Sequence, residues 1–162
     1  MSKFSERDDQ DAAKASLMTV LDNQGITLLL PVLKDGSLAA KCSATELIGW
    51  NGDNQYFPLI IQYANASEPQ MKMAAARALK NLVSVSDQEH IMELLNRESE
   101  PVIVTELQMA LAAAAMKNPV ADKRSEIILN TAKSIGTAEF RKKILSVLSK
   151  TGGREALGLV TA

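Results

Sequence analysis

Helix-like segments of this chain recur at intervals of about 31–37 residues, and this periodicity restricts the possible folds more than any other feature. The tripeptide Ser67-Glu68-Pro69 returns 32 residues later as Ser99-Glu100-Pro101. The alanine-rich segment 72–83 aligns with the segments 31 and 62 residues before it, and the next step along the chain is longer. A period of this length indicates a repeat protein, in which one small structural unit is copied along the chain.

The segments between the chain breaks are predicted to be α-helices. Gly, Asn and Pro occur at regular steps, and these residues suit helix C-caps and first helical turns. Aromatic residues make up only 4% of the chain, whereas Ala, Leu, Lys and Glu are abundant, which favours helix over strand. Short connections imply that successive helices pack antiparallel. We expect about ten helices, over residues 6–22, 27–34, 37–50, 53–65, 68–83, 87–97, 100–117, 121–134, 137–150 and 153–160.

Two helix types alternate, so the repeating unit is a pair of helices. In the first type, Leu29 corresponds to Ile60 and Ile91. In the second type, small residues such as Ala74 and Ala78 allow neighbouring helices to approach closely. One pair cannot bury its apolar faces alone, so about four to five pairs must stack. An ordinary up-and-down helical bundle is the alternative arrangement.

Several segments resemble HEAT repeats, in the short form of the bilin-lyase-like HEAT families. The outer helix of that family often carries Pro in a Leu-rich run, as residues 29–33 and 57–60 do. An Asp in the turn and a basic residue six positions later match Asp35 and Lys41. The inner helix of the family resembles residues 72–79. The resemblance implies an all-α fold, and we expect a right-handed α-α superhelix, a HEAT-like solenoid of antiparallel helix pairs.

The sequence indicates no catalytic, cofactor or metal site. One His and one Cys exclude an internal disulfide and a Cys/His zinc cluster. His90 has apolar residues at its repeat equivalents, so we expect a half-buried packing histidine. Trp50 and Phe57 near one turn are expected to fill a packing gap. Because no P-loop or dinucleotide-binding glycine motif occurs either, we expect that the protein is not an enzyme and needs no cofactor.

Charge is distributed unevenly along the chain. Residues 1–116 carry 9 basic and 15 acidic residues, whereas residues 117–162 carry 9 basic and 4 acidic residues. The basic end includes Arg141, Lys142 and Lys143, which could contact an acidic partner or phosphates. These three residues spread over most of a helix circumference, so nucleic-acid binding is possible but not favoured.

The predicted function is a non-catalytic protein–protein interaction scaffold that presents an extended helical surface to an unidentified protein partner. By repeat register, Glu46, Arg77, Lys80 and Met109 point away from the core on the inner helices and are candidate contacts. The alternatives are a HEAT-like accessory or lyase-type subunit that holds a substrate, and nucleic-acid binding through the basic C-terminal end.

The whole chain, residues 1–162, is expected to form a single HEAT-like repeat domain. The last predicted helix is short and lacks a polar cap, so we expect a fragment of a longer solenoid or multidomain protein. We find no signal peptide and no apolar run long enough for a membrane span. A native chain start would therefore predict a cytoplasmic location.

Overall fold

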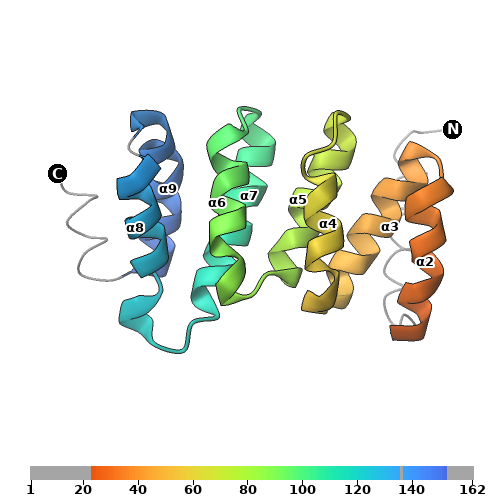
Figure 1. Cartoon of the computed structure of the whole chain (residues 1–162), viewed down its shortest axis with the longest axis horizontal. Helices are drawn as coiled ribbons and strands as arrows, with labels where there is room; N and C mark the ends of the chain where they lie inside the picture. Colours follow the sequence, from red (N-terminus) through yellow and green to blue (C-terminus); the bar gives the residue numbers. More distant parts are fainter. Residues whose placement is uncertain (1–22, 136, 153–162) are drawn as a thin grey trace, which may run out of the picture.

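A computed structural model describes residues 23–135 and 137–152, and within these ranges the regular elements are helices, without strands. Figure 1 shows the described α-helices as a series of antiparallel pairs. Within the described residues the α-helices are α2 (Asn23–Asp35), α3 (Leu38–Asn51), α4 (Phe57–Tyr63), α5 (Pro69–Leu82), α6 (Gln88–Arg97), α7 (Pro101–Met116), α8 (Glu126–Ile135) and α9 (Ala138–Thr151).

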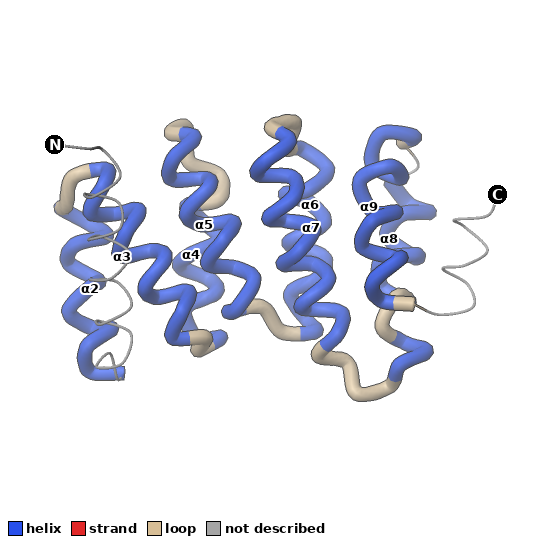
Figure 2. Tube along the Cα trace, turned by 180° about the vertical axis from the view of Figure 1, so that it is seen from behind, coloured by secondary structure: helices blue, strands red, loops and turns tan. Residues whose placement is uncertain are grey.

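The helix pairs stand side by side along the long axis of the molecule and form two rows. The outer row contains α2, α4, α6 and α8, and the inner row contains α3, α5, α7 and α9 (Figures 1 and 2). Consecutive inner helices contact each other. The predicted all-α fold and the alternation of two helix types are confirmed for this part of the chain. The predicted helices 6–22 and 153–160 lie outside the described residues.

Local sequence signals explain where the inner helices begin and end. The Ser37 side chain accepts a hydrogen bond from the Ala40 N–H at 3.3 Å, and Thr137 caps α9 through the Phe140 N–H at 3.2 Å. Pro69 and Pro101 occupy the first turns of α5 and α7, where a missing N–H costs nothing. Gly52 ends α3 with a φ of 76°, a conformation that other residues rarely adopt.

Outer helices α4 and α8 are shorter than predicted, because each is preceded by a 3₁₀ turn, whereas α6 begins within one residue of its predicted start although a 3₁₀ turn precedes it too. The turns cover Asn54–Tyr56, Val85–Asp87 and Ala121–Lys123. Polar side chains stabilise the first two: Asp53 accepts from the Gln55 N–H at 3.0 Å, and Asp87 accepts from the Ser84 N–H at 2.7 Å. Such local hydrogen bonds compete with a regular first helical turn.

The hydrophobic core runs between the two rows, and small residues bring the inner helices together. Ala74, Ala75 and Ala78 are buried, as their predicted role requires. A Cβ atom added at Gly49 would overlap the Ala78 Cα, so α3 and α5 approach closely at this point. The largest buried side chains fill the remaining space; they include Ile48, Leu79, Leu82, Ile91, Leu95, Leu107 and Leu111.

Two packing predictions need correction. His90 is exposed, although its ring contacts the Phe57 ring edge-on at 6.2 Å between centroids. Of its two repeat equivalents, Leu28 is 74% exposed and Leu59 is half-buried against the core, so this register position does not require burial. Phe57 is buried as expected, but Trp50 is 45% exposed. Gly49 faces α5, and the next residue is rotated by about 100° away from that contact.

Candidate functional site

A groove of about 480 Å³ crosses the N-terminal parts of the inner helices α5 and α7 and reaches α3. Three consecutive inner helices therefore supply its walls, and the groove is a property of the stacked repeats rather than of one unit. Its lining residues are Cys42, Glu46, Pro69, Gln70, Met73, Ala74, Arg77, Glu100, Val102 and Ile103.

Arg77 lies between two carboxylates at one end of the groove. Its Nη1 is 3.5 Å from Glu46 Oε1 on α3, and its Nε is 3.3 Å from Glu106 Oε1 on α7. The side chain of Arg77 is 52% exposed, whereas those of Glu46 and Glu106 are 19% and 15% exposed. The guanidinium thus bridges three neighbouring repeats while one face stays accessible to a ligand.

The rest of the groove is largely apolar. Met73 and Ala74 on α5 lie between Cys42 on α3 and Ile103 on α7. Val102, in the first turn of α7, is 53% exposed. The Cys42 Sγ lies 3.9 Å from the Met71 Sδ, which places the thiol in an apolar, sulfur-rich part of the α3–α5 junction. This part of the groove suits apolar side chains of a ligand.

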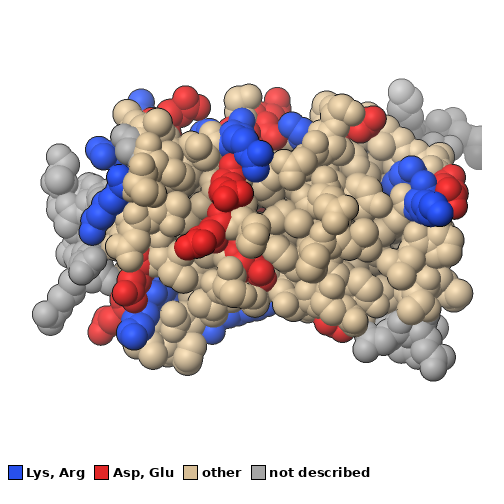
Figure 3. Space-filling view, in the orientation of Figure 1, with Lys and Arg blue, Asp and Glu red and all other residues tan. Residues whose placement is uncertain are grey.

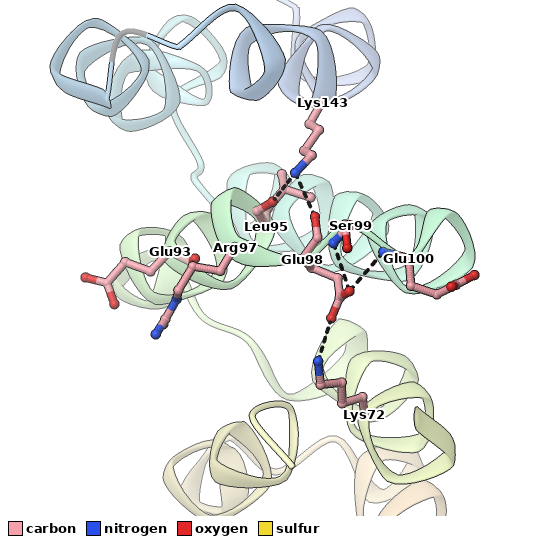
Figure 4. A network of polar contacts seen from close by, with 8 residues as sticks. All are labelled: Lys72, Glu93, Leu95, Arg97, Glu98, Ser99, Glu100 and Lys143. Carbon is pink, nitrogen blue, oxygen red and sulfur yellow. Dashed lines mark hydrogen bonds and ion pairs between the residues drawn. The ribbon is translucent and has the colours of Figure 1, made fainter. Parts of the chain in front are cut away.

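A polar network at Glu98 holds the loop that forms the other end of the groove (Figure 4). The Glu98 Oε1 accepts hydrogen bonds from the Ser99 and Glu100 N–H groups, both at 2.9 Å, and Lys72 Nζ is 3.2 Å from Oε2. From the other side, Lys143 Nζ donates to the main-chain oxygens of Leu95 and Glu98 at 3.1 and 2.7 Å. The loop is therefore tied to α5 and to α9.

The network also changes the acidity of Glu98. Burial raises the pKa of its carboxyl, but hydrogen bonds from the Glu100 N–H, the Lys72 side chain and the Ser99 N–H lower it, and so does the Lys72 charge. The net result is a pKa below the usual value of 4.5. The ionised carboxylate thus stabilises the folded loop.

The structure brings some of the predicted contact residues together and separates others. Glu46 and Arg77 both line the groove and pair with each other. Lys80 is exposed further along α5, and Met109 is only partly exposed on α7; neither is among the groove-lining residues.

The three adjacent basic residues of α9 do not form one surface, as their spread around the helix predicts. Arg141 and Lys142 are exposed, but the Lys143 side chain is only 12% exposed. Its ammonium donates to the α6 carbonyls described above and lies 3.5 Å from Glu139. Lys143 therefore has a structural role within the chain, and the ammonium is not directed into solvent.

The sequence patterns did not single out Glu98, Glu106 or Val102. Glu98 directly precedes the repeated Ser-Glu-Pro tripeptide, which is the one signal that could have drawn attention to it. Glu106 is not at the repeat position of Glu46 and Arg77, so register alone does not reveal the three-residue bridge. Val102 fits the apolar pattern of its helix like a core residue, so only the structure shows that its side chain is exposed.

The outer row presents a different surface. Figure 3 shows carboxylates in a column over α6, whereas the surface over α4 is formed almost entirely by uncharged residues. The exposed α6 carboxylates include Glu89 and Glu93. They lie on the outer row, away from the groove, so substitutions at these residues can serve as controls for substitutions on the inner row.

Residues 23–135 and 137–152 contain no group of three or more His, Cys, Asp or Glu side chains that could hold a metal ion. Within the same ranges, no helix combines the length and the apolar character that a membrane crossing requires.

Comparison with known proteins gives one match. A family model described as HEAT repeats matches residues 26–112, which is more than half of the chain. No curated protein and no solved structure matches the chain. The matched range covers α3 to α6 completely and includes all the residues that line the groove.

Proposed function

Because the chain belongs to the HEAT-repeat family, we propose that it is a non-catalytic scaffold that binds a protein partner on the inner row of helices. HEAT repeats commonly mediate protein–protein interaction. Stacked helix pairs offer an extended surface whose parts are held in place by their neighbours. The proposal includes the finer architecture predicted from the sequence, namely a right-handed superhelix of about ten helices.

The observation that carries the proposal is the groove across α3, α5 and α7. Its walls are helices, and its charged end is fixed by the Glu46–Arg77–Glu106 bridge. A preformed surface of this kind orders few groups on binding, so less of the interaction free energy is lost. The exposed Val102 provides an apolar contact that a partner would cover.

The experiment is affinity capture from a lysate of the source organism, with and without nuclease, followed by mass spectrometry. Val102→Ser removes the exposed apolar side chain from the groove. Val120→Ser is the matched control, because Val120 is similarly exposed, at 49% against 53%, and is not among the groove-lining residues. We expect Val102→Ser, but not Val120→Ser, to lose a specific protein whose capture survives nuclease.

The other outcomes separate the remaining functions. Equal capture by both variants would move the partner surface away from the groove. Capture that collapses with nuclease would favour nucleic-acid binding through the basic C-terminal end. A small molecule that co-purifies with the protein, and is lost in Val102→Ser, would favour the accessory or lyase-type subunit that holds a substrate.

A further inference from the structure

The groove has a chemical character that goes beyond general protein binding. We propose that it takes a partner segment in which a lysine or arginine lies next to an apolar side chain. This inference rests on the proposed function, because it assumes that the inner face binds a polypeptide. It names the class of partner, which the family match does not.

The first support is the negative charge around the groove. Among the described residues, three carboxylates and one guanidinium line the groove or pair with a lining side chain, which gives a formal charge of −2. They are Glu46, Glu100 and Glu106 against Arg77. A cationic partner segment matches this charge.

Glu100 is the carboxylate best placed for such a contact. It is exposed, and it lines the groove at the end opposite to Arg77. It has no ion pair with another described residue, and Figure 4 shows its carboxylate projecting away from the Glu98 network. Although Glu100 is the N-cap residue of α7, its side chain makes no capping hydrogen bond. A cation can therefore bind Glu100 without breaking an existing contact of this carboxylate.

The second support is the position of the apolar surface relative to that charge. Val102 is two residues from Glu100 in the chain, and Met73 and Ile103 line the same groove. A ligand whose cation reaches Glu100 would thus bring its neighbouring side chain over an apolar surface. An apolar contact supplies affinity, while the charge pair at the rim selects the partner and its orientation.

An acidic segment or a nucleic acid fits the groove poorly. Phosphates or carboxylates would approach Glu100 and Glu46, and Arg77 is already paired with two carboxylates. Like charges at close range are repulsive, and they are more so when the contact excludes water. The groove therefore disfavours acidic segments and nucleic acids as partners.

The test is selection of random twelve-residue peptides displayed on phage against the whole chain. Enriched peptides are then synthesised, labelled and measured by fluorescence anisotropy. We expect enrichment of Lys or Arg beside Leu, Ile, Val, Met or Phe. We expect the Kd of these peptides to rise about 3- to 10-fold in Glu100→Gln, and the affinity to fall with salt.

The matched control is Glu89→Gln. Glu89 is also exposed and also lies near a helix N-terminus, in the first turn of α6 on the outer row, whereas Glu100 is the N-cap residue of α7. Loss of its charge therefore has a similar effect on a helix terminus without changing the groove. We expect this variant to keep the parental Kd, and thermal unfolding of both variants shows whether each is folded.

Three results would overturn the inference: no enriched peptide, enrichment of acidic or uncharged peptides, or equal loss of affinity in both Glu variants.

Failure of the proposed function gives a different pattern of results in the two experiments. If the inference alone is wrong, lysate capture still depends on Val102, although the selected peptides lack basic residues or ignore Glu100. If the proposed function is wrong, capture does not depend on Val102, whatever the peptides show.

Discussion

The α3–α5 and α7–α9 junctions join neighbouring inner helices by different means. At α3–α5 the backbones come close, because Gly49 faces Ala78 without a side chain between them. At α7–α9 a long polar side chain spans the junction, since Gln108 Nε2 donates to the Lys143 main-chain oxygen at 2.6 Å, and beside it Lys143 Nζ joins α9 to the end of α6.

The difference shows two ways of specifying one repeat geometry. A close-packed junction forms only where no side chain separates the two backbones. Substitutions that add side-chain atoms there should therefore destabilise it more than substitutions that remove them. A junction spanned by polar side chains depends on hydrogen-bond donors to the carbonyls at helix ends. Loss of one ammonium donor should therefore destabilise it more than a larger side chain would. The four predictions below test this distinction, from the largest expected effect to the smallest.

The largest effect is expected at the close-packed junction. Gly49→Ala should lower the free energy of unfolding by about 2–3 kcal/mol, because the new methyl group would overlap Ala78. Helix propensity alone predicts the opposite sign, a gain of about 1 kcal/mol. Urea denaturation measures the change, and Lys80→Ala, at an exposed position on α5, is the control. A stabilised Gly49→Ala variant would show that the junction is looser than described.

The next effect is expected at the polar junction. Lys143→Met keeps an unbranched apolar side chain but leaves the Leu95 and Glu98 carbonyls without their ammonium donor. We expect a loss of about 1–2 kcal/mol and faster amide hydrogen exchange in α9. Lys142→Met is the neighbouring exposed control and should change stability by less than about 0.5 kcal/mol. Equal effects of the two substitutions would contradict the structural role of Lys143.

The loop between the two junctions should show a pH dependence. The pKa of Glu98 is lowered in the folded protein, so its contribution to stability is complete above the usual value of 4.5. It is lost as the pH falls from there through the lower folded-state pKa. Glu98→Gln should therefore be less stable than the parent at neutral pH, and the difference should shrink in acid. Denaturation at a series of pH values tests this, with Glu100→Gln as control; a constant difference would disprove it.

The smallest effect is expected for the Arg77 bridge. Arg77→Met removes two ion pairs, but the guanidinium is 52% exposed, so we expect a loss below about 1 kcal/mol at low salt. The loss should decrease near about 1 M salt, because exposed charges are screened. Denaturation at the two salt concentrations measures it. A larger, salt-independent loss would show that the bridge adds to the close packing of α3 and α5.

The sequence predicted the helices well because their signals are local. Ser37 and Thr137 cap their own helices, and Pro69 and Pro101 mark first turns within the same few residues. The small residues of α5 also indicated where helices approach each other, because alanine side chains leave room for a second backbone. The 3₁₀ turns were missed, because side-chain hydrogen bonds of Asp53 and Asp87 decide them.

The candidate site was predicted only in part. Glu46 and Arg77 were selected individually from their register, but their pairing with each other and with Glu106 depends on how closely α3, α5 and α7 stack. The role of Lys143 could not be found from a local pattern, because its acceptors lie 45 and 48 residues earlier in the chain. Such contacts are decided by packing between repeats, which a single repeat does not encode.

The lysines that reach back to earlier helices have a consequence for synthesis of the protein. Lys143 completes the C-terminal end of α6, and Lys117 Nζ donates in the same way to the Asn81 and Val83 carbonyls at the end of α5, 36 and 34 residues before it. While the chain emerges from the ribosome, the carbonyls at the ends of α5 and α6 lack these lysine donors until α7 and α9 have been translated. We therefore expect the ends of these two helices to gain their last hydrogen bonds only after the following helix pair has been made.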